Sequence, residues 1–106
     1  MSGCLIVFAN CTDGADEEFN RWYDEVHVPE VLSVGPIVGC QRFRVSDAQS
    51  MDQTHRYLAI YEYEGDAAEA RDALLKDSST FNMSDTLLSD AFMSIAEELG
   101  PRVASS

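Results

Sequence analysis

The stretch EFNRWYDEVHVPEVLSVGPIVGCQRF, Glu18–Phe43, decides the fold, because an amphipathic helix there gives way to a strand. Within it Phe19, Tyr23 and His27 recur at every fourth residue, and Trp22 extends the same stripe. One face of the predicted helix is therefore aromatic and turns toward whatever the helix packs on. The imidazole of His27 lies at the C-terminal end of that face.

The limits of this helix come from residues that favour its start and oppose its continuation. Asp13 is a candidate cap, and the acidic residues after it would lie in the first turn, where the helix dipole favours negative charge. Pro29 lacks an amide hydrogen and biases the residue before it away from helical angles. We predict a helix from about residue 15 to His27 and a break or kink at Pro29, followed by a short turn.

Apolar runs elsewhere predict four strands and a second helix. The strands are expected at Cys4–Ala9, Ile37–Val45, His55–Glu64 and Ala91–Glu98, and the helix at residues 67–76. The last strand has an alternative, since residues 91–99 also fit a helical pattern. In the third strand Tyr57, Tyr61 and Tyr63 share one face, which suits either cross-strand packing or the lining of a pocket.

The order strand, helix, strand, strand, helix, strand is typical of an α+β, ferredoxin-like βαββαβ domain. We expect a four-stranded antiparallel sheet in the order 4-1-3-2, with both helices on one face and a hairpin across residues 46–54. The first strand is apolar on both sides, so the face without helices needs a cover, which a second copy of the sheet would provide. Residues 1–106 form one domain, of which residues 101–106 are expected to be a loose tail.

Composition argues against several classes of partner. The formal net charge of −12 opposes nucleic acid and anionic membranes. Three cysteines without CxxC spacing argue against a disulfide framework or structural zinc, and the two histidines are too few to define a metal site. Because no apolar run resembles a signal peptide or could span a bilayer, we expect a cytoplasmic protein, and no metal or cofactor is implied.

His27 is the residue whose chemistry the pattern leaves open. In an apolar cavity, an imidazole with the Tyr23 hydroxyl in reach can move a proton near neutral pH, as dehydration, isomerisation, cyclisation or C–C cleavage require. Arg42, or a tyrosine of the third strand, could bind a developing enolate or phenolate oxygen. The alternatives are a core-edge histidine satisfied by a carbonyl and a strand arginine paired with a carboxylate such as Glu62.

Three segments resemble the EthD-like family of the dimeric α/β-barrel superfamily: EEFNRWYDEVHVPEVL, GPIVGCQRF and RYLAIYEYEGD. The most distinctive match is WYxxxHxPE, Trp22–Glu30, whereas Gly35-Pro36 reverses the Pro-Gly order usual in that family. The resemblance implies a homodimer in which two sheets pack face to face. It also implies a cavity between sheet and helices, with His27 pointing into it, and it supports a role for Arg42. Relatives that degrade haem tend to use a histidine on the second helix, where this chain has none.

We therefore predict a cofactor-independent enzyme, a lyase or isomerase that acts on a small hydrophobic, aromatic or polyketide-like molecule. The residues expected to act are, for catalysis, His27, Tyr23 and Arg42 and, for substrate binding, Phe19, Trp22, Tyr57 and Tyr61. Two alternatives remain: a non-catalytic dimeric protein that binds such a molecule, and a cofactor-free monooxygenase of phenolic substrates.

Overall fold

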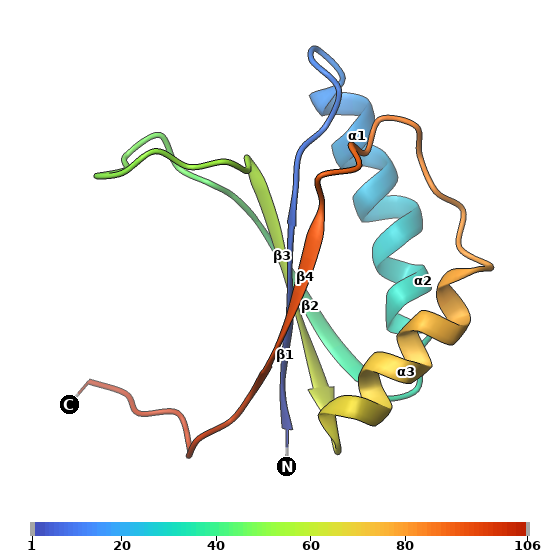
Figure 1. Ribbon diagram of the computed structural model, residues 1–106, viewed down its shortest axis with the longest axis vertical. Coiled ribbons are helices and arrows are strands. Elements are labelled where there is room, and N and C mark those ends of the chain that lie inside the picture. Colours follow the sequence, from blue (N-terminus) through green and yellow to red (C-terminus); the bar gives the residue numbers. More distant parts are fainter. Residues whose placement is uncertain (1, 106) are drawn as a thin grey trace.

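A four-stranded antiparallel sheet carries the helices on one of its faces (Figure 1), as the computed structural model, which describes residues 2–105, shows. The elements in chain order are β1 Ser2–Ala9, α1 Asp16–Trp22, a π-helical turn Tyr23–His27, α2 Val28–Leu32, β2 Ile37–Arg44, β3 Tyr57–Glu64, α3 Ala67–Ser78 and β4 Phe92–Glu97. The strands lie in the order β2-β3-β1-β4, which is the predicted order counted from the other edge. The predicted ferredoxin-like α+β fold is confirmed.

The last strand is the element whose type the sequence left open, and it is a strand. β4 pairs antiparallel with β1 from Gly3 opposite Glu97 to Phe8 opposite Phe92. Residues 101–105 of the expected tail are exposed and lack helix or strand, and Ser106 lies outside the described residues. None of the helices within residues 2–105 has the length and apolar character that crossing a membrane requires.

The first helix begins where it was predicted to begin, but its cap and its C-terminal end differ from the prediction. It begins after the N-cap Ala15, whose side chain makes no capping hydrogen bond, so Asp13 is not the cap. Pro29 neither breaks nor ends it, because the preceding turn widens into a π-helix and α2 continues to Leu32. In that turn the amide of Val28 donates to the carbonyl of Tyr23, five residues back. The wider turn makes room for the proline ring, which would clash with a carbonyl in a regular α-helix.

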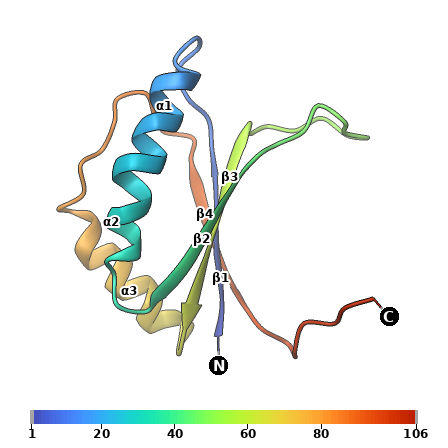
Figure 2. The same cartoon turned by 180° about the vertical axis from the view of Figure 1, so that it is seen from behind.

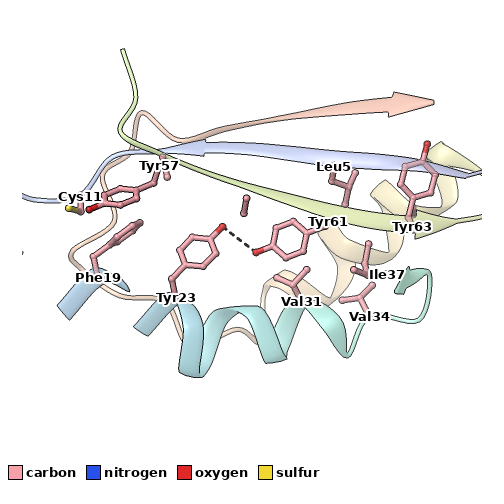
Figure 3. Close-up of a cluster of buried hydrophobic side chains, with 13 residues drawn as sticks. Leu5, Cys11, Phe19, Tyr23, Val31, Val34, Ile37, Tyr57, Tyr61 and Tyr63 are labelled. Atoms are coloured by element: carbon pink, nitrogen blue, oxygen red, sulfur yellow. Dashed lines mark hydrogen bonds between the residues drawn. The ribbon is translucent and has the colours of Figure 1, made fainter. Parts of the chain in front are cut away.

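The core lies between the sheet and the helices, and Figure 3 shows how its side chains meet. The ladder tyrosines Tyr57, Tyr61 and Tyr63 all point into this layer and are buried. Tyr63 donates a hydrogen bond to the carbonyl of Ala96. A side chain on Gly3 would collide with both of these groups, so the glycine permits the close packing there. Cross-strand packing is thus the main role of the ladder.

A β-bulge in β2 explains the imperfect alternation of that strand. The register with β3 shifts between Ile37 and Gly39, and Val38 is left exposed. A bulge inserts one residue and so reverses which positions point inward. Ile37 is buried, and after the shift Arg42 also points toward the helices, opposite the small side chain of Ala59.

The opposite face of the sheet has no covering layer within residues 2–105. Two segments project on that side, the connection between β2 and β3 and the chain after β4 (Figures 1 and 2). The uncovered face carries Phe8 and Phe92, whose rings stack with centroids 5.1 Å apart, together with Phe43, which is 40% exposed. The uncovered face is therefore apolar, as the sequence-based expectation of a covering layer requires.

Candidate active site

The ring of Tyr23, at the start of the π-turn, is the centre of the candidate site. His27 contacts it edge-on, with ring centroids 4.9 Å apart, and the guanidinium carbon of Arg42 lies 4.2 Å from its centroid. The three residues predicted to be catalytic are thus brought together around one buried ring. The imidazole of His27 and the guanidinium of Arg42 have different surroundings.

On one side, His27 is enclosed by aromatic rings. Its imidazole stacks on Trp22 with centroids 4.8 Å apart and meets the edge of Phe81 at 5.9 Å. Residues five apart align on one face of a π-turn, which is why the partner in the stack is Trp22 rather than Tyr23 at i−4. The sequence predicted these aromatic surroundings, and both Tyr23 and Trp22 contact the imidazole.

The His27 imidazole is only half-buried, yet one of its nitrogens is sealed off. Nδ1 is inaccessible and has no hydrogen-bond partner within residues 2–105. Desolvation lowers the pKa of His27, with a smaller contribution from the positive charge of Arg42, while Glu30 opposes the shift. The ring is therefore neutral near pH 7, and neither the Tyr23 hydroxyl nor a backbone carbonyl, two of the partners considered from the sequence, satisfies Nδ1 within residues 2–105.

A hydrogen-bonded clamp holds the loop after α3 against this part of the helix. The indole Nε1 of Trp22 donates to the carbonyl of Asn82 at 2.7 Å. The carboxylate of Glu30 accepts from the backbone amide and the side-chain amide of Asn82, each at 3.0 Å. These contacts fix the neighbouring Phe81 beside His27.

On the other side of Tyr23, Arg42 is well supplied with partners. Its guanidinium donates to Asp24 at 2.9 Å and to Asn20 at 2.8 Å, and its side chain is 15% exposed. The acidic partner is Asp24 on the helix, not Glu62, because the bulge turns Arg42 to the helix side. Only Nε lacks a partner among the buried atoms of this side chain. A guanidinium over a phenol face is also a favourable cation–π arrangement.

A polar pocket opens beside Arg42 at the β2 edge. It has a volume of about 280 Å³ and is lined by Asn20, Asp24, Arg42, Phe43, Arg44 and Tyr57. The Tyr57 hydroxyl donates to Asp16 at 2.6 Å and accepts from Asn20 at 3.3 Å. The hydrogen bond from Tyr57 lowers the pKa of Asp16, whereas desolvation raises the pKa of Tyr57, and the Asp16 carboxylate adds to that rise.

Tyr61 and Tyr23 form a buried pair of phenols. The Tyr61 hydroxyl donates to the Tyr23 hydroxyl at 3.2 Å, as the dashed line in Figure 3 marks. Desolvation raises the pKa of both groups above the ordinary value of 10, strongly in Tyr61. Both side chains are therefore protonated at physiological pH and serve as neutral hydrogen-bonding groups.

The space between sheet and helices is filled where the family resemblance implied a cavity. Phe19 packs against Tyr23 and Tyr57, with centroids 5.6 and 5.3 Å apart. His27 lines none of five pockets that open on the surface of residues 2–105. Of the predicted substrate-binding residues, Tyr57 borders the Arg42 pocket, Trp22 lies beside His27, and Phe19 and Tyr61 are in the core.

Sequence reasoning missed Asn20, Glu30 and Phe81 in this region, and it considered Asp24 as a partner of His27 rather than of Arg42. Asn20 and Asp24 are one turn apart on the helix, so the helical spacing that selected Tyr23 could have found this pair. Glu30 lies within the distinctive motif itself. Phe81 follows α3 in an irregular loop, where no periodicity connects it to His27, and only the tertiary structure reveals it.

Comparison with known proteins supports the fold. Neither the protein-family models nor the curated proteins give a match to this sequence. Among solved structures, an EthD family protein from Bacillus halodurans C-125 is 17% identical with a TM-score of 0.63, covering 93% of this chain and 100% of that one. A variant of MhuD with two manganese protoporphyrin IX molecules per active site is 15% identical with a TM-score of 0.71, covering 96% and 99%. A proposed monooxygenase from Shewanella loihica PV-4 is 10% identical with a TM-score of 0.64, covering 94% and 96%.

An EthD family member is among these neighbours, as the sequence resemblance led us to expect. At identities of 17% or lower the likeness establishes the fold, and the fold includes enzymes such as MhuD. Fold alone does not carry an activity from one protein to another. The function has to be argued from the groups around Tyr23.

Proposed function

We propose that this protein is a cofactor-independent enzyme, a lyase or isomerase in which His27 moves a proton on a small hydrophobic, aromatic or polyketide-like molecule. The observation that carries the proposal is the buried, unpartnered Nδ1 of a neutral imidazole among aromatic rings. Leaving a buried polar atom unpaired costs stability, so such an atom is a candidate for a functional role. A neutral imidazole in dry surroundings is suited to accept a proton from carbon or oxygen.

The groups around His27 support a substrate with a flat ring. Trp22 and Phe81 present a ring face and a ring edge, to which an aromatic ligand could add a further stacking partner. Arg42 contacts the ring of Tyr23, and its positive charge acts at His27, so it would favour a developing enolate or phenolate there. Tyr23 and Tyr61 would act as neutral hydrogen-bonding groups.

Substrate entry requires space that the single chain does not provide at His27. The half-exposed imidazole borders the loop that carries Phe81, and this loop is held there by the clamp of Trp22, Glu30 and Asn82. Rotation of the Phe81 side chain would open a path to Nδ1 without disturbing the clamp. We place substrate entry between the helix and this loop for that reason.

The homodimer through the uncovered sheet face is part of the proposal. Alternation along β1 and β3 puts Ile6, Phe8 and Ile60 on that face, where Phe43 and Phe92 are substantially exposed. A contiguous apolar surface of this kind marks an interaction site. A second sheet packed on it would leave both helix layers, and with them both His27 sites, on the outside of the assembly.

A non-catalytic dimeric binding protein is the second candidate, favoured by the packed core between the sheet and the helices. If Phe19, Tyr23, Tyr57 and Tyr61 simply fill that layer, His27 could recognise a ligand without changing it. The open pocket beside Arg42 would then be the binding site. A cofactor-free monooxygenase of phenolic substrates is distinguished from both by consumption of oxygen.

The test is turnover of a panel of aromatic and polyketide-like carbonyl compounds, followed by mass spectrometry and with oxygen uptake recorded. We expect His27→Gln to lower kcat by a factor of about 10² to 10⁴, the usual contribution of a positioned acid–base group. His55→Gln is the matched control, since His55 lies at the far end of β3 against Phe8 and Phe92. Unchanged turnover in His27→Gln, or ligand binding without any product, would exclude the proton-transfer role.

A further inference from the structure

Two segments rise from the uncovered face at opposite ends of the sheet. The arm, residues 45–56, follows the end of β2, whereas the tail, residues 98–105, follows the end of β4. The strand register places them: Tyr57, next to the arm, pairs with Ala9, and Glu97, next to the tail, pairs with Gly3. Both project away from the helices (Figures 1 and 2).

An apolar hollow lies at the base of the arm. It has a volume of about 440 Å³, and its floor is made by Phe8, Phe43, Leu58 and Ile60, which belong to the uncovered face. Its rim is polar and includes Gln49 of the arm. A hollow with an apolar floor and a polar rim has the anatomy of a docking site for an apolar side chain.

The tail carries apolar side chains without contacts of their own. Leu99 is fully exposed and Val103 is 89% exposed, in a segment that lacks helix or strand. Arg102 lies between them, and the arm contains Asp47 and Asp52 in a protein whose net charge is −12. The tail therefore offers the hollow two apolar side chains, and Arg102 can approach Asp47 or Asp52, although Glu98 balances the charge of the tail as a whole.

A chain cannot dock its own tail there, because arm and tail lie at opposite ends of one sheet. When two copies pack face to face about a two-fold axis that runs across the strands, the tail of each copy reaches the arm end of the other. The lateral offset between β4 and β2 is about 14 Å for three strand spacings. The tail up to Val103 spans about 20 Å when extended, so it can bridge that offset.

We propose that the tail of each copy docks, through Leu99 and Val103, into the hollow at the base of the arm of a second copy. This inference rests on the proposed sheet-face dimer and adds its symmetry: the two-fold axis runs across the strands, and each copy contributes one tail and one arm. An axis along the strands would instead leave the two tails at the same end, away from the arms.

The test uses the full chain with Gln49→Cys and Val103→Cys combined. On mild oxidation we expect a covalent dimer that reducing agent reverses, because each two-fold pair brings one arm thiol to one tail thiol. The parent chain controls for cross-linking through the native cysteines. Each single variant tests the alternative axis along the strands, which would bring two arms or two tails together. Arm-to-arm or tail-to-tail cross-linking in a single variant would overturn the proposal, as would a double variant that remains uncross-linked while it is dimeric.

Dimer affinity supplies an independent readout that needs no thiol chemistry. In sedimentation velocity, Leu99→Ser with Val103→Ser is expected to weaken dimerisation at least tenfold. Leu75→Ser is the matched control, since Leu75 is an exposed leucine of α3 on the helix side, and should leave the affinity unchanged. An unchanged dimer in the tail variant overturns tail docking alone, whereas a parent chain that is monomeric throughout removes the sheet-face dimer as well.

Discussion

The two polar groups that contact Tyr23, the guanidinium of Arg42 and the imidazole of His27, differ in how many hydrogen-bond partners surround them. Arg42 is brought to the ring with an acid, an amide and a phenol face around its guanidinium, so its charge is compensated. His27 is brought to the same ring with aromatic neighbours and a buried nitrogen that has no partner in the described part of the chain. Each side keeps one buried nitrogen without a partner within residues 2–105, Nε of Arg42 and Nδ1 of His27, but the Arg42 guanidinium makes two other hydrogen bonds. The comparison teaches that the Arg42 side resembles a structural element, whereas the imidazole of His27 keeps its hydrogen-bonding capacity free for another group, as a reactive site does.

Removal of the shared ring is expected to have the largest effect. Tyr23→Ala deletes a buried aromatic side chain that contacts Phe19, His27 and Arg42. We expect a loss of about 3–5 kcal/mol in the free energy of unfolding, the usual cost of such a truncation. Urea denaturation followed by circular dichroism measures it. Tyr23→Phe is the matched control and should cost about 1 kcal/mol, because only the hydrogen bond with Tyr61 is lost. A small loss in Tyr23→Ala would mean that the ring does not hold the two sides together.

The contribution of Arg42 and Asp24 to the free energy of unfolding should depend on salt, and mutation of either residue should lower stability only moderately. Arg42→Met keeps the aliphatic stem and removes the guanidinium, so we expect the free energy of unfolding to fall by about 1–2 kcal/mol. Asp24→Asn should cost less than about 1 kcal/mol, since the Asp24 side chain is 63% exposed. The difference between parent and Asp24→Asn should shrink in high salt, as denaturation at two salt concentrations would show. If Arg42→Met is neutral for folding but abolishes turnover, the structural interpretation of this side is wrong.

Much of the fold was predictable because it depends on local patterns. The periods of 2 and 3.6 residues identified every strand and both helical regions, and the sheet order followed from the βαββαβ sequence of elements. The π-turn was not predictable in the same way. Pro29 opposes an α-helix, and whether the chain breaks or widens depends on the packing of Val31, the buried residue of α2, which the sequence does not state.

The site was predictable only in part, for a related reason. Helical spacing placed Phe19, Tyr23 and His27 on one face, and the structure gathers them there. The partner of Arg42 depended on a bulge of one residue in β2, and the neighbour of His27 depended on an irregular loop. Neither feature leaves a periodic signal, so the pairing of Asp24 with Arg42 and the contact of Phe81 with His27 could be found only in three dimensions.

The smallest expected effect is a dependence of the free energy of unfolding on pH that the titration of His27 causes. Burial holds the pKa of His27 in the folded chain below the ordinary histidine value of 6.5, so the unfolded chain binds this proton more tightly. The stability contributed by neutral His27 is present above pH 6.5 and is lost as the pH falls from there toward the folded-state pKa. The parent should therefore lose more stability between pH 7.5 and pH 5 than His27→Gln, in which the group is absent. Other titrating groups are common to both chains and cancel in the difference, which urea denaturation at each pH measures.

NMR titration of the imidazole signals, assigned with His55→Gln, gives the folded-state pKa of His27 directly. A value above 6.5 would mean that a carboxylate such as Glu30 outweighs the aromatic enclosure.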